Sequence, residues 1–76
     1  MKDLLEALAR GLVDDPRRVR VRERADEDFV RLDLEVAEED RGRVIGRGGR
    51  TADALRTILD AVARAQDRDC RLEILG

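Results

Sequence analysis

The chain has 76 residues, of which 42% are apolar and 45% charged, and its formal net charge is −2. This length predicts one small domain spanning residues 1–76, because so short a chain supports one compact core and not two lobes around a cleft. The lack of histidine and the single cysteine, Cys70, exclude an internal disulfide and a cysteine-pair zinc site and remove the commonest general base, so we expect no enzyme, cofactor or metal centre.

The first half of the sequence predicts one helix and two strands. Residues 3–13 carry a single apolar stripe at helical spacing, with Asp3 as the expected N-cap and Pro16 shortly after the helix end. Residues 19–23 and 29–36 alternate apolar and charged side chains. This alternation is typical of an antiparallel pair of strands with one buried and one wet face.

The second half predicts two helices around a glycine-rich turn, followed by a strand. A short helix over 38–45 opens with acidic residues, which suit a helix N-terminus through the helix dipole. Three glycines fall within residues 46–49, a longer helix follows over about 50–65, and residues 69–75 alternate as a last strand. The predicted fold is α+β, with three helices on one face of a three-stranded mixed sheet. The last strand should lie parallel to the second, because a helical crossover connects them.

The charge is divided unevenly along the chain. Residues 41–56 contain five arginines and one aspartate and carry +4, whereas the other sixty residues carry −6. A local positive patch on an acidic body directs a polyanion to one site.

The glycine-rich turn predicts an anion site. Its position before a helix leaves backbone N–H groups free to bind an anion, and the glycines let a sugar-phosphate backbone approach closely. We expect an apolar groove for bases beside the turn, lined by Val44, Ile45, Ala52 and Leu55. The motif does not fit a P-loop or a dinucleotide fingerprint, because it lacks their spacing and follows a helix.

In this context the turn resembles the Gly-x-x-Gly loop of a KH domain, which clamps the backbone of about four nucleotides of single-stranded nucleic acid. Residues 29–75 match the minimal KH motif, and the helix and strand before them resemble the type II, bacterial topology. The run from Gly42 to Thr57 resembles the signature of the small bacterial single-KH proteins of the KhpA family. The sequence departs from that pattern at Glu38, where a proline is expected, and at Arg41, where an apolar residue is usual.

The resemblance implies a non-catalytic, cytoplasmic RNA-binding protein with no membrane segment and no small-molecule substrate. It also implies a homodimer, or a heteromer with the larger multidomain KH protein KhpB (also called Jag or EloR), and roles as an RNA chaperone or regulator linked to cell elongation and division. The expected RNA-binding residues are Arg43, Ile45, Gly46, Arg47, Gly48, Gly49, Arg50, Thr51 and Arg56. An adaptor that mainly pairs with other proteins and contacts RNA weakly is the alternative.

Simpler structural roles remain open for several of these residues. Arg56 is at the right helical spacing to pair with Asp53 or Asp60, and Thr51 either contacts phosphate or caps the helix. The remaining choices concern residues outside the loop. The arginines at positions 17, 18, 20, 22 and 24 are expected to form cross-strand charge pairs in preference to a second RNA surface. Cys70 and Phe29 are expected to pack as ordinary apolar side chains.

Overall fold

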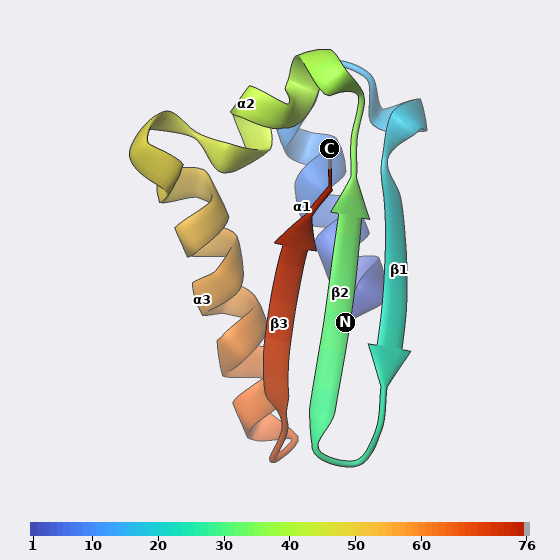
Figure 1. The fold of residues 1–76 in the computed structure, drawn as a ribbon, viewed down its shortest axis with the longest axis vertical. Helices are drawn as coiled ribbons and strands as arrows, with labels where there is room; N and C mark the ends of the chain where they lie inside the picture. The colour runs from blue at the N-terminus through green and yellow to red at the C-terminus, as the bar shows by residue number, and fades with distance from the viewer. Residues whose placement is uncertain (76) are drawn as a thin grey trace.

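The computed structural model describes residues 1–75 and contains the predicted elements in the predicted order (Figure 1). The α-helices and strands are α1 (Lys2–Leu12), β1 (Arg20–Ala25), β2 (Phe29–Glu35), α2 (Arg41–Ile45), α3 (Arg50–Ala65) and β3 (Asp69–Ile74). Single 3-10 turns lie at Pro16–Arg18, Glu38–Asp40 and Arg47–Gly49. The short helix predicted over 38–45 is therefore a 3-10 turn followed by one turn of α-helix.

The sheet has the order β1-β2-β3, with β1 antiparallel and β3 parallel to the central strand β2. The parallel pairing confirms the arrangement expected from the helical crossover. In Figure 1 the sheet faces the viewer and α1 lies behind it, while α3 runs beside the edge strand β3. One face of the sheet is thus covered by helices and the other is open.

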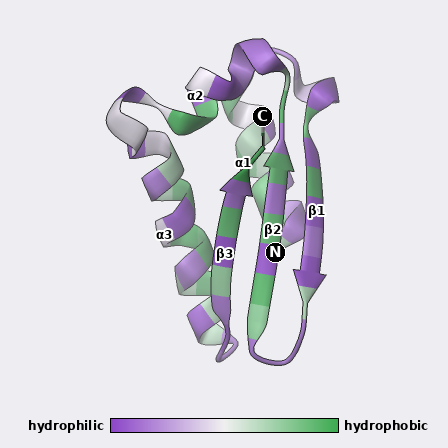
Figure 2. Ribbon diagram, viewed as in Figure 1, coloured by the Kyte–Doolittle hydropathy of each residue, from purple (hydrophilic) through white to green (hydrophobic). Residues whose placement is uncertain are grey.

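The core lies between the covered face and the helices. Val30, Leu32 and Leu34 of β2 are fully buried, whereas Arg31 between them and Glu35 after them are exposed. This alternation is visible along the strands in Figure 2. The helices contribute Leu5 and Ala9 of α1, Val44 of α2, and Leu55, Leu59 and Ala63 of α3. Burying a leucine side chain fully stabilises the fold by about 1.5–3 kcal/mol, so this layer supplies most of the cohesion of the domain.

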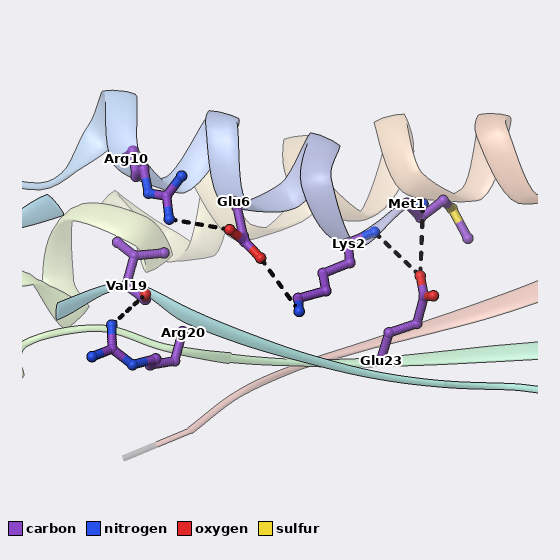
Figure 3. Close-up of polar contacts among 7 residues, drawn as sticks. All are labelled: Met1, Lys2, Glu6, Arg10, Val19, Arg20 and Glu23. Carbon is purple, nitrogen blue, oxygen red and sulfur yellow. Dashed lines mark hydrogen bonds and ion pairs between the residues drawn. The ribbon is translucent and has the colours of Figure 1, made fainter. Parts of the chain in front are cut away.

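Helix α1 begins one residue earlier than predicted, and Asp3 is not its N-cap. A carboxylate from the sheet binds the helix start instead (Figure 3). Glu23 Oε1 of β1 accepts a hydrogen bond from the backbone N–H of Lys2 at 3.2 Å and lies 3.6 Å from the terminal amine of Met1. A contact from the sheet therefore satisfies a backbone N–H at the start of α1, where the sequence predicts a local cap by Asp3.

Strand β1 is longer than predicted and ends at Ala25 rather than residue 23. Arg24 and Ala25 continue the ladder opposite Arg31 and Val30. The turn comes only at Asp26, whose carboxylate accepts the backbone N–H groups of Asp28 and Phe29 at 2.9 and 2.8 Å. Residues 24–28 are mostly polar, which is typical of a turn, so the sequence does not predict this extension. The last strand, by contrast, ends at Ile74 rather than residue 75.

Asp40 is the one buried charged residue in the part of the chain that the structure describes, with 2% of its surface exposed. Its two carboxylate oxygens accept the backbone N–H groups of Asp14 and Asp15 at 3.2 and 3.1 Å. Arg43 Nε lies 3.5 Å from the same carboxylate. Asp40 therefore ties the segment after α1 to the turn that opens α2, in addition to any effect on the helix dipole.

We expect Asp40→Asn to destabilise the protein by about 1–3 kcal/mol, because the amide accepts only one of the two backbone hydrogen bonds well and removes the charge that faces Arg43. Urea unfolding followed by circular dichroism measures the change. Asp53→Asn is the matched control. It removes an exposed carboxylate paired with Arg56 and should change stability by less than about 1 kcal/mol. Equal effects of the two substitutions would contradict the anchoring role of Asp40.

Candidate nucleic-acid interface

The turn between α2 and α3 has a backbone that glycine alone adopts easily. Gly46, Gly48 and Gly49 have φ values of 76°, 63° and 80°, all in the region that L side chains rarely adopt. The hydrogen bonds of the turn run from Gly46 N–H to Gly42 O and from Gly49 N–H to Gly46 O, and Arg50 N–H donates to Arg47 O. None of the turn and cap hydrogen bonds in residues 1–75 uses the N–H of Arg47 or Gly48, so these two donors are available to a ligand.

The glycines differ in the space around them. A Cβ at Gly46 would lie 2.8 Å from the Cβ of Thr51, so the Thr51 side chain packs directly against this glycine. A Cβ at Gly48 or Gly49 would meet nothing within 4 Å. Gly46 is therefore fixed by close packing as well as by φ, whereas Gly48 and Gly49 stand at the open tip of the turn. No side-chain hydrogen bond caps α3, so Thr51 does not cap it and supports the turn instead.

The arginines near the turn fall into two groups. Arg47 and Arg50 are exposed at the tip and at the first position of α3, and no ion pair found in residues 1–75 involves either of them. Arg43 lies 2.9 Å from Asp14 and 3.5 Å from Asp40 and so forms part of the Asp40 anchor. Arg56 lies 3.5 Å from Asp53, which is one of the two partners expected from helical spacing.

The prediction of an apolar groove beside the turn is wrong for three of its four lining residues. Val44, Ala52 and Leu55 have at most 3% of their surface exposed, because they face the sheet and belong to the core. Ile45 alone of the four is open, at 39%. The helical periodicity predicts which face of each helix is apolar, but it does not predict what packs against that face. Ile58 of α3 is likewise exposed, at 41%.

A shallow hollow of about 270 Å³ lies instead between α3 and the edge strand β3. It is lined by Arg56, Leu59, Asp60, Cys70, Arg71, Leu72 and Glu73. Its two leucines are buried, and charged residues of both signs make up most of its lining. The sequence alone does not reveal this hollow, because it joins residues of a helix and a strand whose relative position depends on the parallel pairing.

Cys70 is half-buried in this hollow. Burial raises the pKa of its thiol above the ordinary value, and the nearby carboxylates of Asp60 and Glu23 raise it further. The thiolate is the nucleophilic form, so Cys70 is less reactive than an ordinary cysteine at neutral pH. This agrees with the expectation that Cys70 acts as a small apolar side chain.

The open face of the sheet carries five further arginines, at positions 20, 22, 24, 31 and 71. Arg20 stands opposite Glu35, and Arg22 opposite Asp33, as cross-strand pairing requires. The ion pairs found on this face of the described residues, however, run along the strands: Arg31 with Asp33 and Arg71 with Glu73. Arg20 donates to the carbonyl groups of Arg17 and Val19 instead. The residues of the predicted cross-strand pairs therefore lie opposite each other in the sheet, but they form none of the ion pairs found in the described residues.

No helix of the described residues is long and apolar enough to cross a membrane, and residues 1–75 hold no group of side chains suited to a metal ion.

Two helices joined by a Gly-x-x-Gly turn, set on a mixed sheet and preceded by a helix and a strand, define a KH domain of the type II topology. The sequence model of the KhpA/KhpB KH domain matches residues 2–74, and the chain belongs to this family. The family is non-enzymatic, and the chain is no enzyme.

Similar proteins come from distant bacteria and match over nearly their whole length. The RNA-binding protein KhpA of Clostridium acetobutylicum is 45% identical over 75 residues, covering 99% of this chain and 100% of that protein. The proteins of the same name from Halalkalibacterium halodurans and Treponema pallidum are 47% and 46% identical, covering 99% and 97% of this chain and 99% and 92% of their own lengths. No solved structure is significantly similar to this chain.

We expect Gly46→Ala to destabilise the domain and Gly42→Ala to leave it unchanged or stabilise it. Alanine at position 46 would be forced to a positive φ and into Thr51, whereas position 42 lies in α2 with open space around it. Alanine favours a helix over glycine by about 1 kcal/mol, which corresponds to a rise in melting temperature of about 4–8 °C for a domain of this size. Thermal melting of the two variants measures both effects, and a Gly46→Ala variant as stable as the parent would contradict the close packing described above.

Proposed function

We propose that this chain is a non-catalytic protein that binds single-stranded RNA through the turn between α2 and α3. The observation that carries the proposal is the pair of unused N–H groups, those of Arg47 and Gly48, at the tip of a turn that no Cβ obstructs. Such donors bind phosphate oxygens, and the dipole of the sixteen-residue helix α3 adds partial positive charge at the same place. The relatives named RNA-binding protein KhpA support this proposal.

The side chains around the turn have different roles in the proposed binding of RNA. Arg47 and Arg50 supply charge to the phosphates, because neither is committed to an ion pair found in residues 1–75. Ile45 offers the exposed apolar surface nearest the turn, and Arg56 stands at the rim of the hollow between α3 and β3. Gly46, Gly49 and Thr51 hold the backbone of the turn in place. Arg43 acts indirectly, by fixing α2 through Asp14 and Asp40.

When the turn holds the phosphates of an RNA, the neighbouring bases would lie in the hollow between α3 and β3. Leu59 and Leu72 are buried behind its surface, so the half-buried Cys70 and the aliphatic stems of Arg56 and Arg71 offer its apolar contact. The polar groups of Arg56 and Asp60 would form hydrogen bonds with base edges. With no aromatic side chain in its lining, the hollow should discriminate modestly between bases. The single domain proposed here, residues 1–76, would therefore bind as one short-footprint unit in the cytoplasm.

The resemblance to small single-KH proteins extends the proposal to partners. We propose that the protein acts with a second copy of itself or with the larger multidomain KH protein KhpB, as an RNA chaperone or regulator linked to cell elongation and division. One KH domain contacts only a few nucleotides of RNA. A second KH unit bound to the same RNA raises the effective concentration of the first, so pairing would strengthen binding to the RNA.

The double substitution Arg47→Asp with Gly48→Asp should weaken RNA binding at least about a hundredfold while leaving the fold intact. It removes one cation and places two carboxylates where phosphates bind, and each lost charge-assisted hydrogen bond is worth about 1.5–3 kcal/mol. The backbone at position 48 has φ near 63°, a conformation that aspartate tolerates better than most residues. Fluorescence anisotropy with a labelled random-sequence single-stranded RNA measures the affinity, and circular dichroism checks the fold.

The chain offers a matched control for this variant in the dipeptide Arg10-Gly11 of α1. Both residues are exposed, and a Cβ at Gly11 meets nothing within 4 Å. Arg10→Asp with Gly11→Asp makes the same change of charge on another surface and should lower affinity far less. If both double variants bind RNA as tightly as the parent, the turn is not the RNA site.

A second candidate function, protein pairing, is favoured by one exposed apolar stripe on α3. Ala54, Ile58, Ala61 and Ala65 recur at spacings of four, three and four and are all exposed. Three small side chains around one large one suit close approach of a second helix. The occupant we propose is a second copy of this chain, whose own α3 offers the same self-complementary stripe, as an isologous dimer requires.

Ile58→Asp should convert a dimer to a monomer, whereas Leu12→Asp should not. The two side chains are exposed to similar extents, 41% and 37%, but Leu12 lies on α1, away from the stripe. A charge in the centre of an apolar interface is desolvated without a partner, which disfavours association strongly. Sedimentation velocity across a concentration series gives the mass. A parent that is monomeric at high micromolar concentration would contradict the pairing function.

A further inference from the structure

Three arginines stand side by side across the open face of the sheet. The register places Arg24 opposite Arg31 across β1 and β2, and Arg31 opposite Arg71 across β2 and β3. Their side chains point away from the core, because the neighbouring Val30 and Leu72 are buried. Like charges directly opposite one another destabilise a sheet. The arginine row, Arg24, Arg31 and Arg71, therefore concentrates positive charge without stabilising the fold itself.

Two members of the row are held in matching geometry. Arg31 Nε lies 3.2 Å from Asp33 Oδ1, and Arg71 Nε lies 3.2 Å from Glu73 Oε1. Each pair links residues two apart, and β2 and β3 run parallel, so the two arginines start from backbones about one strand spacing (about 4.8 Å) apart and make the same contact along their strands. Their terminal nitrogens donate none of the hydrogen bonds found in residues 1–75. The row thus presents two oriented donor groups suited to phosphate oxygens.

The only aromatic side chain of the protein, Phe29, lies next to this row. It opens β2 on the same face as Arg31 and is 39% exposed. Arg24, Asp26, Phe29 and Arg31 line a hollow of about 260 Å³ together with Ala25. The Asp26 carboxylate is occupied by the backbone of the turn, where it accepts two N–H groups. A flat apolar ring beside cations is the arrangement on which single-stranded nucleic acids stack a base.

The arginine row is continuous with the site already proposed. Arg71 and Glu73 line the hollow between α3 and β3, which also contains Arg56. The edge strand β3 separates that hollow from the open face, as its position beside α3 in Figure 1 shows. An RNA strand leaving the hollow therefore reaches Arg71 first, then Arg31 and Arg24. The acidic residues Asp28 and Asp69 lie beside this path, where β2 and β3 begin.

We propose that the arginine row and Phe29 form a second contact surface for single-stranded RNA. The phosphates lie on the three guanidinium groups and one base stacks on Phe29, so that an RNA longer than about four nucleotides continues from the turn, round the β3 edge, onto the open face. RNA fits better than an acidic peptide, because RNA uses both the cations and the aromatic ring. This inference rests on the proposed function and extends its footprint.

Nuclear magnetic resonance of the ¹⁵N-labelled protein separates the two sites. A random-sequence tetranucleotide RNA should shift amide signals of the turn, of α3 and of β3, which line the site already proposed. A random-sequence dodecanucleotide RNA should shift these and also the signals of Arg24, Phe29 and Arg31. Shifts confined to the turn, α3 and β3 with both RNAs would overturn the second surface and leave the proposed function standing. No shift with either RNA would overturn both.

Variants then test the contacts themselves. The triple substitution Arg24→Gln, Arg31→Gln and Arg71→Gln should weaken dodecanucleotide binding at least tenfold at about 0.1 M salt. It should weaken tetranucleotide binding less than threefold, because Arg71 is the one member of the row that also lines the hollow between α3 and β3. Losing three phosphate contacts should also reduce the slope of log affinity against log salt by about 2. Phe29→Leu, which keeps the bulk but removes the aromatic ring, should weaken dodecanucleotide binding about fivefold or more.

A second triple variant, Lys2→Gln, Arg10→Gln and Arg17→Gln, removes the same charge from α1 and the turn after it. It should change dodecanucleotide affinity less than threefold, and circular dichroism checks that both triple variants fold. Equal losses in the two triple variants would show a general charge effect and overturn the proposal. Unchanged RNA binding with altered oligomeric mass in the arginine-row variant would assign the row to a protein contact instead.

Discussion

The position of the turn between α2 and α3 depends on one buried carboxylate. Asp40 lies where the chain leaves the sheet and enters α2, and its oxygens hold the segment that follows α1 through two backbone hydrogen bonds. A buried carboxylate without partners is strongly unfavourable, so this part of the fold forms only when those N–H groups are in place. The helix and strand that precede the minimal KH motif are thereby bonded to it and not merely packed against it.

Arg43 extends this anchor toward the turn. It pairs with both Asp14 and Asp40, three residues before Gly46. Helix α2 has only five residues, too few to be stable without tertiary contacts. The buried Val44 and the ion pair of Arg43 with Asp14 supply such contacts. The tip of the turn can therefore consist of glycine and exposed arginine, because α2 does not depend on the tip for its place.

Local patterns predicted the elements well and the long-range contacts poorly. The alternation in β2 and the apolar stripe of α3 follow from burial on one face, and the sequence shows both directly. Glu23 and Asp40 act on segments 21 and 26 residues away in sequence, so nothing beside them in the chain signals their roles. The groove prediction failed for the same reason. Val44 and Leu55 are apolar whether they face a ligand or the sheet, and only the packing decides between the two.

The parallel pairing of β2 with β3 also governs how the protein folds. Each registered pair, such as Phe29 with Asp69, joins residues 40 positions apart, whereas β1 and β2 meet across a short turn. Non-local pairing slows folding, because the intervening chain loses conformational entropy before the contacts form. That intervening chain contains Gly46, Gly48 and Gly49, which lose more conformational freedom on folding than other residues do. The glycines that give the turn its positive-φ backbone thus raise the entropic barrier to completing the sheet, so the geometry of the turn is obtained at the expense of folding speed.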